Sequence, residues 1–278
     1  MLGEVMSMYL LYTDEVNINP ASTEFFIYGG VAVHSNQAAS LSAEVDRLRG
    51  EYGYQPNDPL KFNTKERPAG ISPDAHKEIK RQVIETAVKH GVRLFTSFIL
   101  HKIATSPDEA RRKEINRVCY NFDVFLKQEN EFGLVLIDTF SDEKLPEILR
   151  EKFAIGLRGF PFSRIYRLER VLGFHLATIG SSNFSSVVDI VLGSLRYAVN
   201  SRVKPDRHVV ACTLLQQIAP MYIPGNKPGD ISELSVFFSP KTVKVVNYQK
   251  QYCELSRYLK KCGFGHATAP DQCGDYDG

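Results

Sequence analysis

Runs of apolar residues with short or alternating spacing predict five β-strands along the chain. Each run is rich in aromatic and β-branched residues, which favour a pleated and partly buried surface. The predicted strands cover residues 8–14, 25–33, 92–103, 132–140 and 165–177. The first two are close enough in sequence to pair as antiparallel neighbours, and the later ones alternate with longer segments.

Those longer segments have the apolar spacing of amphipathic helices. The predicted helices cover residues 38–52, 73–90, 107–129, 143–155, 184–201, 207–220 and 247–262. Ser72 and Ser106 each precede a proline at the first helical position, and Gly91 follows the end of a helix. Two stretches rich in Pro, Gly and Asn, 53–70 and 222–241, are interpreted as long loops.

This order of elements predicts an α/β chain whose mixed sheet is covered by helices on both faces. We expect the sheet to form one domain over residues 8–201. Residues 202–262 are interpreted as a helical C-terminal extension packed on that domain, and residues 263–278 as a flexible tail.

Composition favours an ordinary globular protein, because 43% of the 278 residues are apolar and 24% are charged. No apolar run approaches the roughly 20 residues of a membrane span, and the start lacks a signal peptide. The five cysteines are scattered, and none lies in a Cys-x-x-Cys pair. The sequence therefore predicts a soluble, cytoplasmic protein without a zinc site or a disulfide framework. The seven histidines are also scattered, and His208 is interpreted as a residue that caps a helix.

Charge is uneven along the chain, although the net charge is only +2. Residues 241–261 hold six basic residues against one acid, Glu254, so this segment carries +5 and the remainder −3. Lys250, Arg257 and Lys261 share one helix face, which predicts contact with the phosphates of a nucleic acid. The alternative is a solvated helix face, because Tyr248, Tyr252, Leu255 and Leu259 form a core stripe on the same helix.

Two predicted strands end on carboxylates. "LLYTDE" stops on Asp14 and Glu15, and "FGLVLID" stops on Asp138. Because ligand sites in such sheets lie at strand ends, we expect Asp14 and Asp138 to approach each other. Glu15 would point to the opposite face from Asp14, as an auxiliary ligand or an orienting residue.

A third carboxylate, Asp189, is the only acid in an apolar helix. Its neighbours at helical spacing are small, namely Ser185, Ser186 and Gly193, which leaves room for an approaching group. Carboxylates that gather in this way repel one another unless a cation lies between them. Their oxygens suit Mg²⁺ or Mn²⁺, and two such ions about 3.5–4 Å apart can promote phosphodiester cleavage. We expect the three carboxyl groups to converge within about 8 Å; the alternative for each acid alone is a cap or a salt bridge.

Three stretches, "YTDEVNINPASTEFFIYGGVAV", "LVLID" and "SSVVDIVLGSLRYAVN", resemble motifs of the domain-of-unknown-function family 3800. That family opens with a strand reading Tyr-Ile-Asp-Glu-Ser-Gly, followed by a strand with a Gly-Gly pair. A later strand ends in Asp, and a helix reads roughly Gln-x-Ala-Asp-hydrophobic. The resemblance covers about residues 8–201.

The resemblance implies a ribonuclease-H-like fold with an acidic, divalent-metal site. Some family members look like nucleases associated with mobile elements or anti-phage defence. Asp14, Glu15, Asp138 and Asp189 match the family's acids, and "NDPLKFN" offers Lys61 and Asn63 where the family has an acid-x-Lys element. The chain departs from the family where Pro59 replaces that acid, with Asp58 one place out of register. It also has Val16-Asn17 for Ser-Gly, and Ser186 and Val188 for the Gln and Ala.

Together, these observations predict a metal-dependent nuclease that uses Mg²⁺ or Mn²⁺ and acts on DNA or RNA. The alternative is a catalytically inactive module that binds nucleic acid or protein and retains the acidic site. No membrane partner is expected, and a homodimer is left open. The predicted catalytic residues are Asp14, Glu15, Asp138, Asp189 and Lys61; the predicted metal ligands are Asp14, Asp138 and Asp189; the predicted substrate-binding residues are Asn63, Lys250, Arg257 and Lys261.

Overall fold

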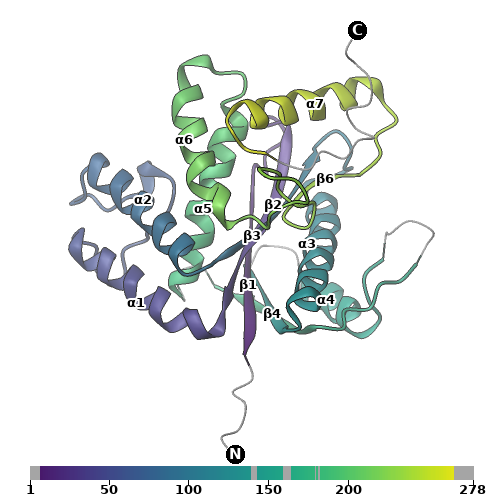
Figure 1. The fold of residues 1–278 in the computed structure, drawn as a ribbon, viewed down its shortest axis with the longest axis horizontal. Helices are drawn as coiled ribbons and strands as arrows, with labels where there is room; N and C mark the ends of the chain where they lie inside the picture. Colours follow the sequence, from purple (N-terminus) through teal and green to yellow (C-terminus); the bar gives the residue numbers. More distant parts are fainter. Residues whose placement is uncertain (1–6, 139–142, 159–163, 179, 181, 266–278) are drawn as a thin grey trace, which may run out of the picture.

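A six-stranded sheet forms the centre of the molecule, with helices on both of its faces (Figure 1). The computed structural model describes residues 7–138, 143–158, 164–178, 180 and 182–265. Its strands are β1 (Met8–Val16), β2 (Phe25–His34), β3 (Arg93–Leu100), β4 (Phe132–Asp138), β5 (Val171–Ala177) and β6 (Val236–Ser239). Its helices are α1 (Ser35–Glu51), α2 (Pro73–Lys89), α3 (Pro107–Glu129), α4 (Leu145–Ala154), α5 (Asn183–Asn200), α6 (His208–Ile218) and α7 (Val246–Lys261). Short 3₁₀ turns are η1 (Thr64–Glu66), η3 (Pro205–Arg207) and η4 (Ala219–Met221).

The strands lie in the order β5-β4-β1-β2-β3-β6. The first three strands form an antiparallel meander, β4 and β5 run parallel to β1, and β6 runs parallel to β3. β1 therefore lies at the centre of the sheet, between an antiparallel and a parallel neighbour. A ligand site at its C-terminal end can draw side chains from β4 and β5 as well.

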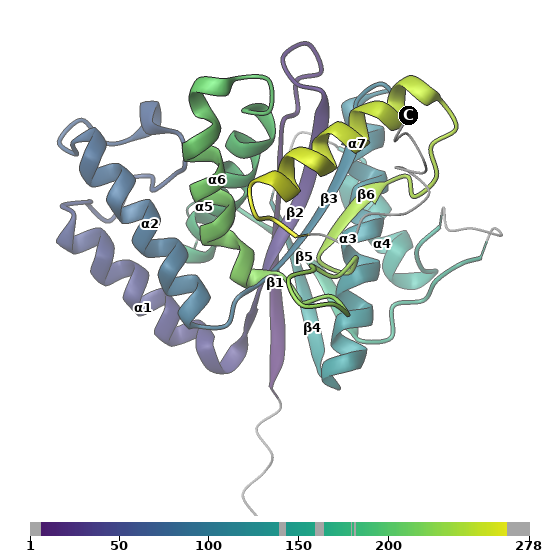
Figure 2. The same cartoon turned by 45° about the horizontal axis from the view of Figure 1, so that its top comes forward.

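Two apolar layers cover the sheet (Figure 2). On one face, α1, α2, α5, α6 and α7 pack against the strands, and on the other face α3 and α4 do so. Side chains along β1 alternate between these layers, as the two-residue period of a strand requires. Leu11 is buried on the α3 side, whereas Tyr12 packs on the α5 side.

The predicted mixed α/β sheet with helices on both faces is confirmed. Most helix bounds agree with the predictions to within a few residues. The start signals act as expected, because Ser72 Oγ accepts from Ala75 N and Ser106 Oγ accepts from Glu109 N, both at 3.1 Å. Gly91 adopts a positive φ of 66° directly after α2.

Two predictions of secondary structure need correction. The stretch 222–241 is not only a loop, because its apolar residues Val236–Ser239 pair with Thr96–Ile99 as β6. The segment 202–262 thus holds α6 and α7 and, between them, a loop and this strand. The fifth strand begins at Val171 rather than at residue 165, because Tyr166 pairs with Leu157 in an isolated bridge instead. Residues 139 and 140 of the fourth predicted strand lie outside the described residues, as do residues 266–278 of the predicted tail.

Within the described residues, no helix has the length and apolar character needed to cross a membrane.

Candidate active site: an acidic cleft at the strand ends

A cleft of about 860 Å³ opens where β1, β4 and β5 end. The sheet forms its floor, and α1, α5 and the loop through residues 54–61 form its walls. The charged residues of its lining are five acids and two bases, namely Asp14, Asp46, Asp58, Asp138, Asp189, Arg49 and Lys61. This balance makes the cleft negatively charged, so it favours cations over free phosphate groups.

Asp14 and Asp138 are neighbours across two parallel strands. Thr13 of β1 is in register with Ile137 of β4, so the next residue of each strand is the aspartate. Adjacent strands lie about 4.8 Å apart, and both aspartates point to the face that carries Tyr12 and Leu136. The structure therefore brings both strand-end carboxylates into one cleft.

Asp189 reaches the same cleft from α5, which lies across this face of the sheet. Phe184 in the first turn of α5 packs on Tyr12 of β1, with ring centroids 4.9 Å apart. The carboxylate of Asp189 accepts a hydrogen bond from the backbone N–H of Phe62 at 2.6 Å. This hydrogen bond joins α5 to Phe62, which directly follows the loop through residues 54–61 (the wall loop), at the predicted metal ligand Asp189.

The small residues around Asp189 have two different uses. A Cβ added at Gly193 would lie 2.3 Å from the Cβ of Phe62, so the bare glycine lets Phe62 pack onto α5. Ser185 and Ser186 instead line the cleft. Of the space that these small residues leave on α5, the part at Gly193 is filled by Phe62, and the part at Ser185 and Ser186 opens into the cleft.

The pKa of Asp14 is raised from 3.8 to about 7. Burial is the largest cause, and the charge of Glu15 follows; the hydrogen bond from Glu15 N to Asp14 Oδ1 (2.7 Å) acts in the opposite direction. The charges of Asp138 and Asp189 raise the Asp14 pKa further. Asp14 thus responds to both of the other predicted metal ligands, as expected for carboxylates around one site.

The pKa of Asp189 is also raised, mainly by burial. The hydrogen bond from Phe62 N and the positive charges of Lys61 and Arg196 oppose this shift. A backbone donor and two cations thus oppose the effect of burial at Asp189.

Lys61 lies in the lining of the cleft, as predicted for a residue that meets phosphate. Its Nζ is 3.0 Å from Glu66 Oε2, and this pair raises the pKa of Lys61. Asp189 and Asp14 raise that pKa to a smaller extent, so Lys61 stays protonated beside the acids. Asn63 does not line the cleft: its side chain accepts from Lys65 N and donates to Glu66, which orients the partner of Lys61. Contact of Asn63 with substrate stays a prediction.

Two basic residues near the cleft were missed from the sequence. Arg49 of α1 donates to the carbonyl oxygens of Gln55, Pro56 and Asp58, and so fastens the wall loop. Lys80 of α2 donates to Phe62 O at 2.8 Å, and burial lowers the Lys80 pKa to about 8. Neither residue lies in a recognisable motif, because both act on backbone carbonyl groups, which carry no sequence signature.

Glu15 lies outside the lining of the cleft, on the other face of β1. Its carboxylate is 2.8 Å from Arg111 of α3, and both side chains are about 7% exposed. Burial raises the pKa of Glu15, with Arg111 acting in the opposite direction. Of the two roles expected for Glu15, auxiliary ligand or orienting residue, the buried ion pair with Arg111 favours the orienting one.

The predicted substrate-binding residues of α7 lie outside the cleft lining. Lys250, Arg257 and Lys261 are exposed, whereas Tyr252, Leu255 and Leu259 of the same helix are buried. The predicted core stripe is thus confirmed, and the three basic residues lie on the exposed part of the helix. Contact with nucleic acid stays a prediction.

The acidic trio is not a compact ligand set. Among the described residues, the group of three whose donor atoms all lie within 4.8 Å of one another is His208, Cys212 and Cys262. Convergence of the three carboxyl groups within about 8 Å stays a prediction.

The His208 group corrects two interpretations of the sequence. Cys212 and Cys262 form a disulfide, although disulfides were not expected. His208 begins α6 without a capping hydrogen bond, and its ring faces the two sulfur atoms. The cysteines are 50 positions apart, and only the packing of α6 against the end of α7 brings them together.

Comparisons with protein-family models, with curated proteins and with solved structures found no match to this chain. The resemblance to family 3800 therefore rests on the motifs alone, and the family assignment stays a prediction.

Proposed function

We propose that the chain is a divalent-metal-dependent nuclease that hydrolyses phosphodiester bonds of DNA or RNA in the acidic cleft. The observation that carries the proposal is the grouping of Asp14, Asp138 and Asp189, from two strand ends and one helix, around a single cleft. The raised pKa of Asp14 supports it, since neighbouring carboxylates contribute to that shift.

The donor set fits a hard divalent cation. Carboxylate oxygens are the protein ligands that Mg²⁺ and Mn²⁺ prefer. A cleft with five acids and two bases would repel a phosphodiester, so a bound cation is needed before substrate can approach. When bound there, such ions supply an activated water and charge stabilisation for the leaving oxygen.

The chain's own residues would perform the remaining work. Asp14, Asp138 and Asp189 would hold the metal, and Phe62 N–H keeps Asp189 oriented. Lys61, protonated beside the acids, would neutralise the phosphate or position the attacking water. Glu15 would act only from behind the site, through its backbone N–H on Asp14.

The test is a cleavage assay with labelled DNA, RNA and hybrid substrates in Mn²⁺, with chelator as the blank. A thermal melt measures metal binding in parallel. We expect Mn²⁺ to raise Tm and support cutting, and the double variant Asp14→Asn, Asp138→Asn to lose both effects. Asp74→Asn, an exposed acid of α2, serves as the control.

Each outcome separates the proposal from its alternatives. A Tm shift that survives in the double variant would place the metal elsewhere. A shift that depends on the aspartates, without cleavage of any substrate, would favour the inactive binding module.

A further inference from the structure

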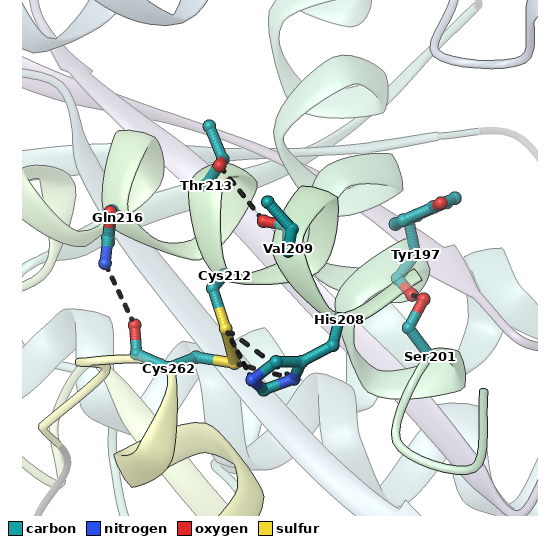
Figure 3. Close-up of a disulfide and its surroundings, with 8 residues drawn as sticks. All are labelled: Tyr197, Ser201, His208, Val209, Cys212, Thr213, Gln216 and Cys262. Carbon is teal, nitrogen blue, oxygen red and sulfur yellow. Dashed lines mark hydrogen bonds between the residues drawn. A yellow bond between two sulfur atoms is a disulfide. The ribbon is translucent and has the colours of Figure 1, made fainter. Parts of the chain in front are cut away.

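Three soft metal ligands meet where α6 packs against the end of α7 (Figure 3). His208 Nδ1 lies 3.8 Å from the sulfur of Cys212 and 4.0 Å from that of Cys262. His208 Nε2 is 3.6 Å from the Cys212 sulfur. The three side chains thus point toward one centre, from two helices that are distant in sequence.

Local structure explains this convergence. His208 and Cys212 are four positions apart on α6, so their side chains lie on the same helix face one turn apart. Cys262 follows the last residue of α7, and its carbonyl oxygen accepts a hydrogen bond from Gln216 of α6 at 3.4 Å. That bond and the apolar contacts of Leu215 and Leu259 in one core layer hold the two helices in place.

We infer that His208, Cys212 and Cys262 form a site for a soft divalent ion, Zn²⁺, when the disulfide between the cysteines is reduced. A dithiol can supply that reduction: it gives up two electrons and two protons, becomes a disulfide itself, and leaves two cysteine thiols. Zn²⁺ then displaces the two thiol protons, which pass to water. Both thiolate sulfurs and one imidazole nitrogen bind the ion, and water fills the fourth position.

The distances fit this coordination. With Zn–S of about 2.3 Å and Zn–N of about 2.0 Å, a tetrahedral site has a sulfur–nitrogen edge of about 3.6 Å and a sulfur–sulfur edge of about 3.8 Å. The separations of the imidazole nitrogens from the sulfurs, 3.6–4.0 Å, already lie close to that edge. Only the two sulfurs must move apart, by turning their side chains once the bond between them is open.

The chemistry of the donors separates this site from the acidic cleft. Thiolate and imidazole favour Zn²⁺ over Mg²⁺ or Mn²⁺, whereas carboxylates have the opposite preference. The site is also accessible, because His208 and Cys212 are partly exposed and only Cys262 is buried. Metal ion and disulfide are therefore alternative links between the same two helices, and either one fastens α6 to α7.

The test uses the full chain, reduced under argon with a phosphine, which takes an oxygen atom from water as the two thiols form. Titration with Co²⁺ should give thiolate-to-cobalt charge-transfer absorption and the visible bands of a tetrahedral ion at one equivalent. Zn²⁺ should displace the cobalt and raise Tm of the reduced protein but not of the oxidised protein.

The variants decide which residues bind. Cys212→Ser and Cys262→Ser should lose the charge-transfer band, and His208→Ala, which retains both cysteines, should weaken binding at least about tenfold. Cys253→Ala, a buried cysteine of α7 outside the group, should bind as the parent does. The variant Asp14→Asn, Asp138→Asn should also bind normally, which keeps this test independent of the proposed nuclease site.

Absence of the charge-transfer band in the reduced parent would overturn the inference. The same holds if affinity is unchanged in His208→Ala, or if the cysteines stay disulfide-bonded in the presence of the phosphine.

Discussion

Asp14 and Glu15 are consecutive residues of β1, yet their carboxylates lie on opposite faces of the sheet. Asp14 lines the cleft, and Glu15 lies 2.8 Å from Arg111 of α3. Strand alternation separates the two acids by function as well as by direction. The adjacent pair therefore offers an internal comparison between a proposed metal ligand and a supporting residue.

We expect Asp14→Asn and Glu15→Gln to differ in Mn²⁺ binding. Loss of a ligand should weaken Mn²⁺ binding more than about a hundredfold, whereas the change behind the site should cost about 10–100-fold, as for a residue that only supports a ligand. The Mn²⁺-dependent rise in Tm measures both. Equal losses in the two variants would contradict the assignment of Asp14 as the ligand.

Stability should depend on the ionisation of Asp14. Its pKa rises from 3.8 in the unfolded chain to about 7 in the folded protein, so the folded state binds more protons between these values. The contribution of Asp14 to the free energy of unfolding therefore falls as pH rises from about 4 to about 7. In chelator at pH 8, Asp14→Asn should be more stable than the parent by roughly 1–3 kcal/mol, and this gain should shrink toward pH 4. Urea unfolding at both pH values checks the sign; a gain that is the same at both would refute this account.

Asp189→Asn should abolish cleavage while the fold holds. The asparagine oxygen can still accept from Phe62 N–H, and the substitution removes a charge that burial disfavours. Stability in chelator should therefore hold or rise. Asp123 of α3 is the matched control, since it is a fully buried acid that accepts from Tyr166 and Arg170 N at 2.8 Å. Asp123→Asn should lower stability by about 2–4 kcal/mol. A comparable drop for Asp189→Asn would identify Asp189 as a structural acid.

Gly193→Ala should damage the site without touching a carboxylate. The added Cβ would lie 2.3 Å from Phe62, so the wall loop must move and carry Phe62 N–H away from Asp189. We expect a loss of about 1–3 kcal/mol in stability together with weaker Mn²⁺ binding. Gly70→Ala is the control, because no atom beyond its chain neighbours lies within 4 Å of its added Cβ and Gly70 lies outside the cleft lining. If both alanine variants keep parental Mn²⁺ affinity, the loop does not position Asp189.

The basic face of α7 should contribute to nucleic-acid affinity and not to chemistry. Charge-neutralising changes at Lys250, Arg257 and Lys261 should weaken binding and flatten its dependence on salt, by about one unit of slope per lost phosphate contact. Binding measured over a salt series checks this, with Lys77→Gln, Lys89→Gln and Lys113→Gln as the control set from α2 and α3. If the affinity for nucleic acid at low salt is unchanged, the basic face of α7 is a solvated helix face that does not contact nucleic acid.

Local patterns account for what could be predicted. The periodicity of apolar residues located the helices, and the rule that sites lie at strand ends pointed to Asp14 and Asp138. Asp189 stood out because a lone acid in an apolar helix needs a reason to be there. Each of these signals lies within one element of the chain.

Contacts between distant segments account for what was missed. The fit of Phe62 against Gly193 and the disulfide between Cys212 and Cys262 depend on packing that no spacing in the sequence encodes. β6 is only four residues long and follows a stretch rich in Pro and Gly, so its apolar run is too short to predict a strand alone. Pairing with a partner strand, rather than a pattern within these four residues, makes the segment a strand.

That partner strand is β3. One edge of β3 pairs with β6, which is synthesised only when the C-terminal third of the chain is made. Thr96 pairs with Val236, and Leu100 N donates to the hydroxyl of Tyr252 in α7. Contacts of such long sequence separation slow folding, and during synthesis β3 must wait for the C-terminal third to emerge. Until then its open edge can pair with other chains. A fragment that ends at residue 201 would keep all three predicted metal ligands, yet we expect it to aggregate during expression, so the proposed nuclease activity should be assayed with the C-terminal third of the chain present.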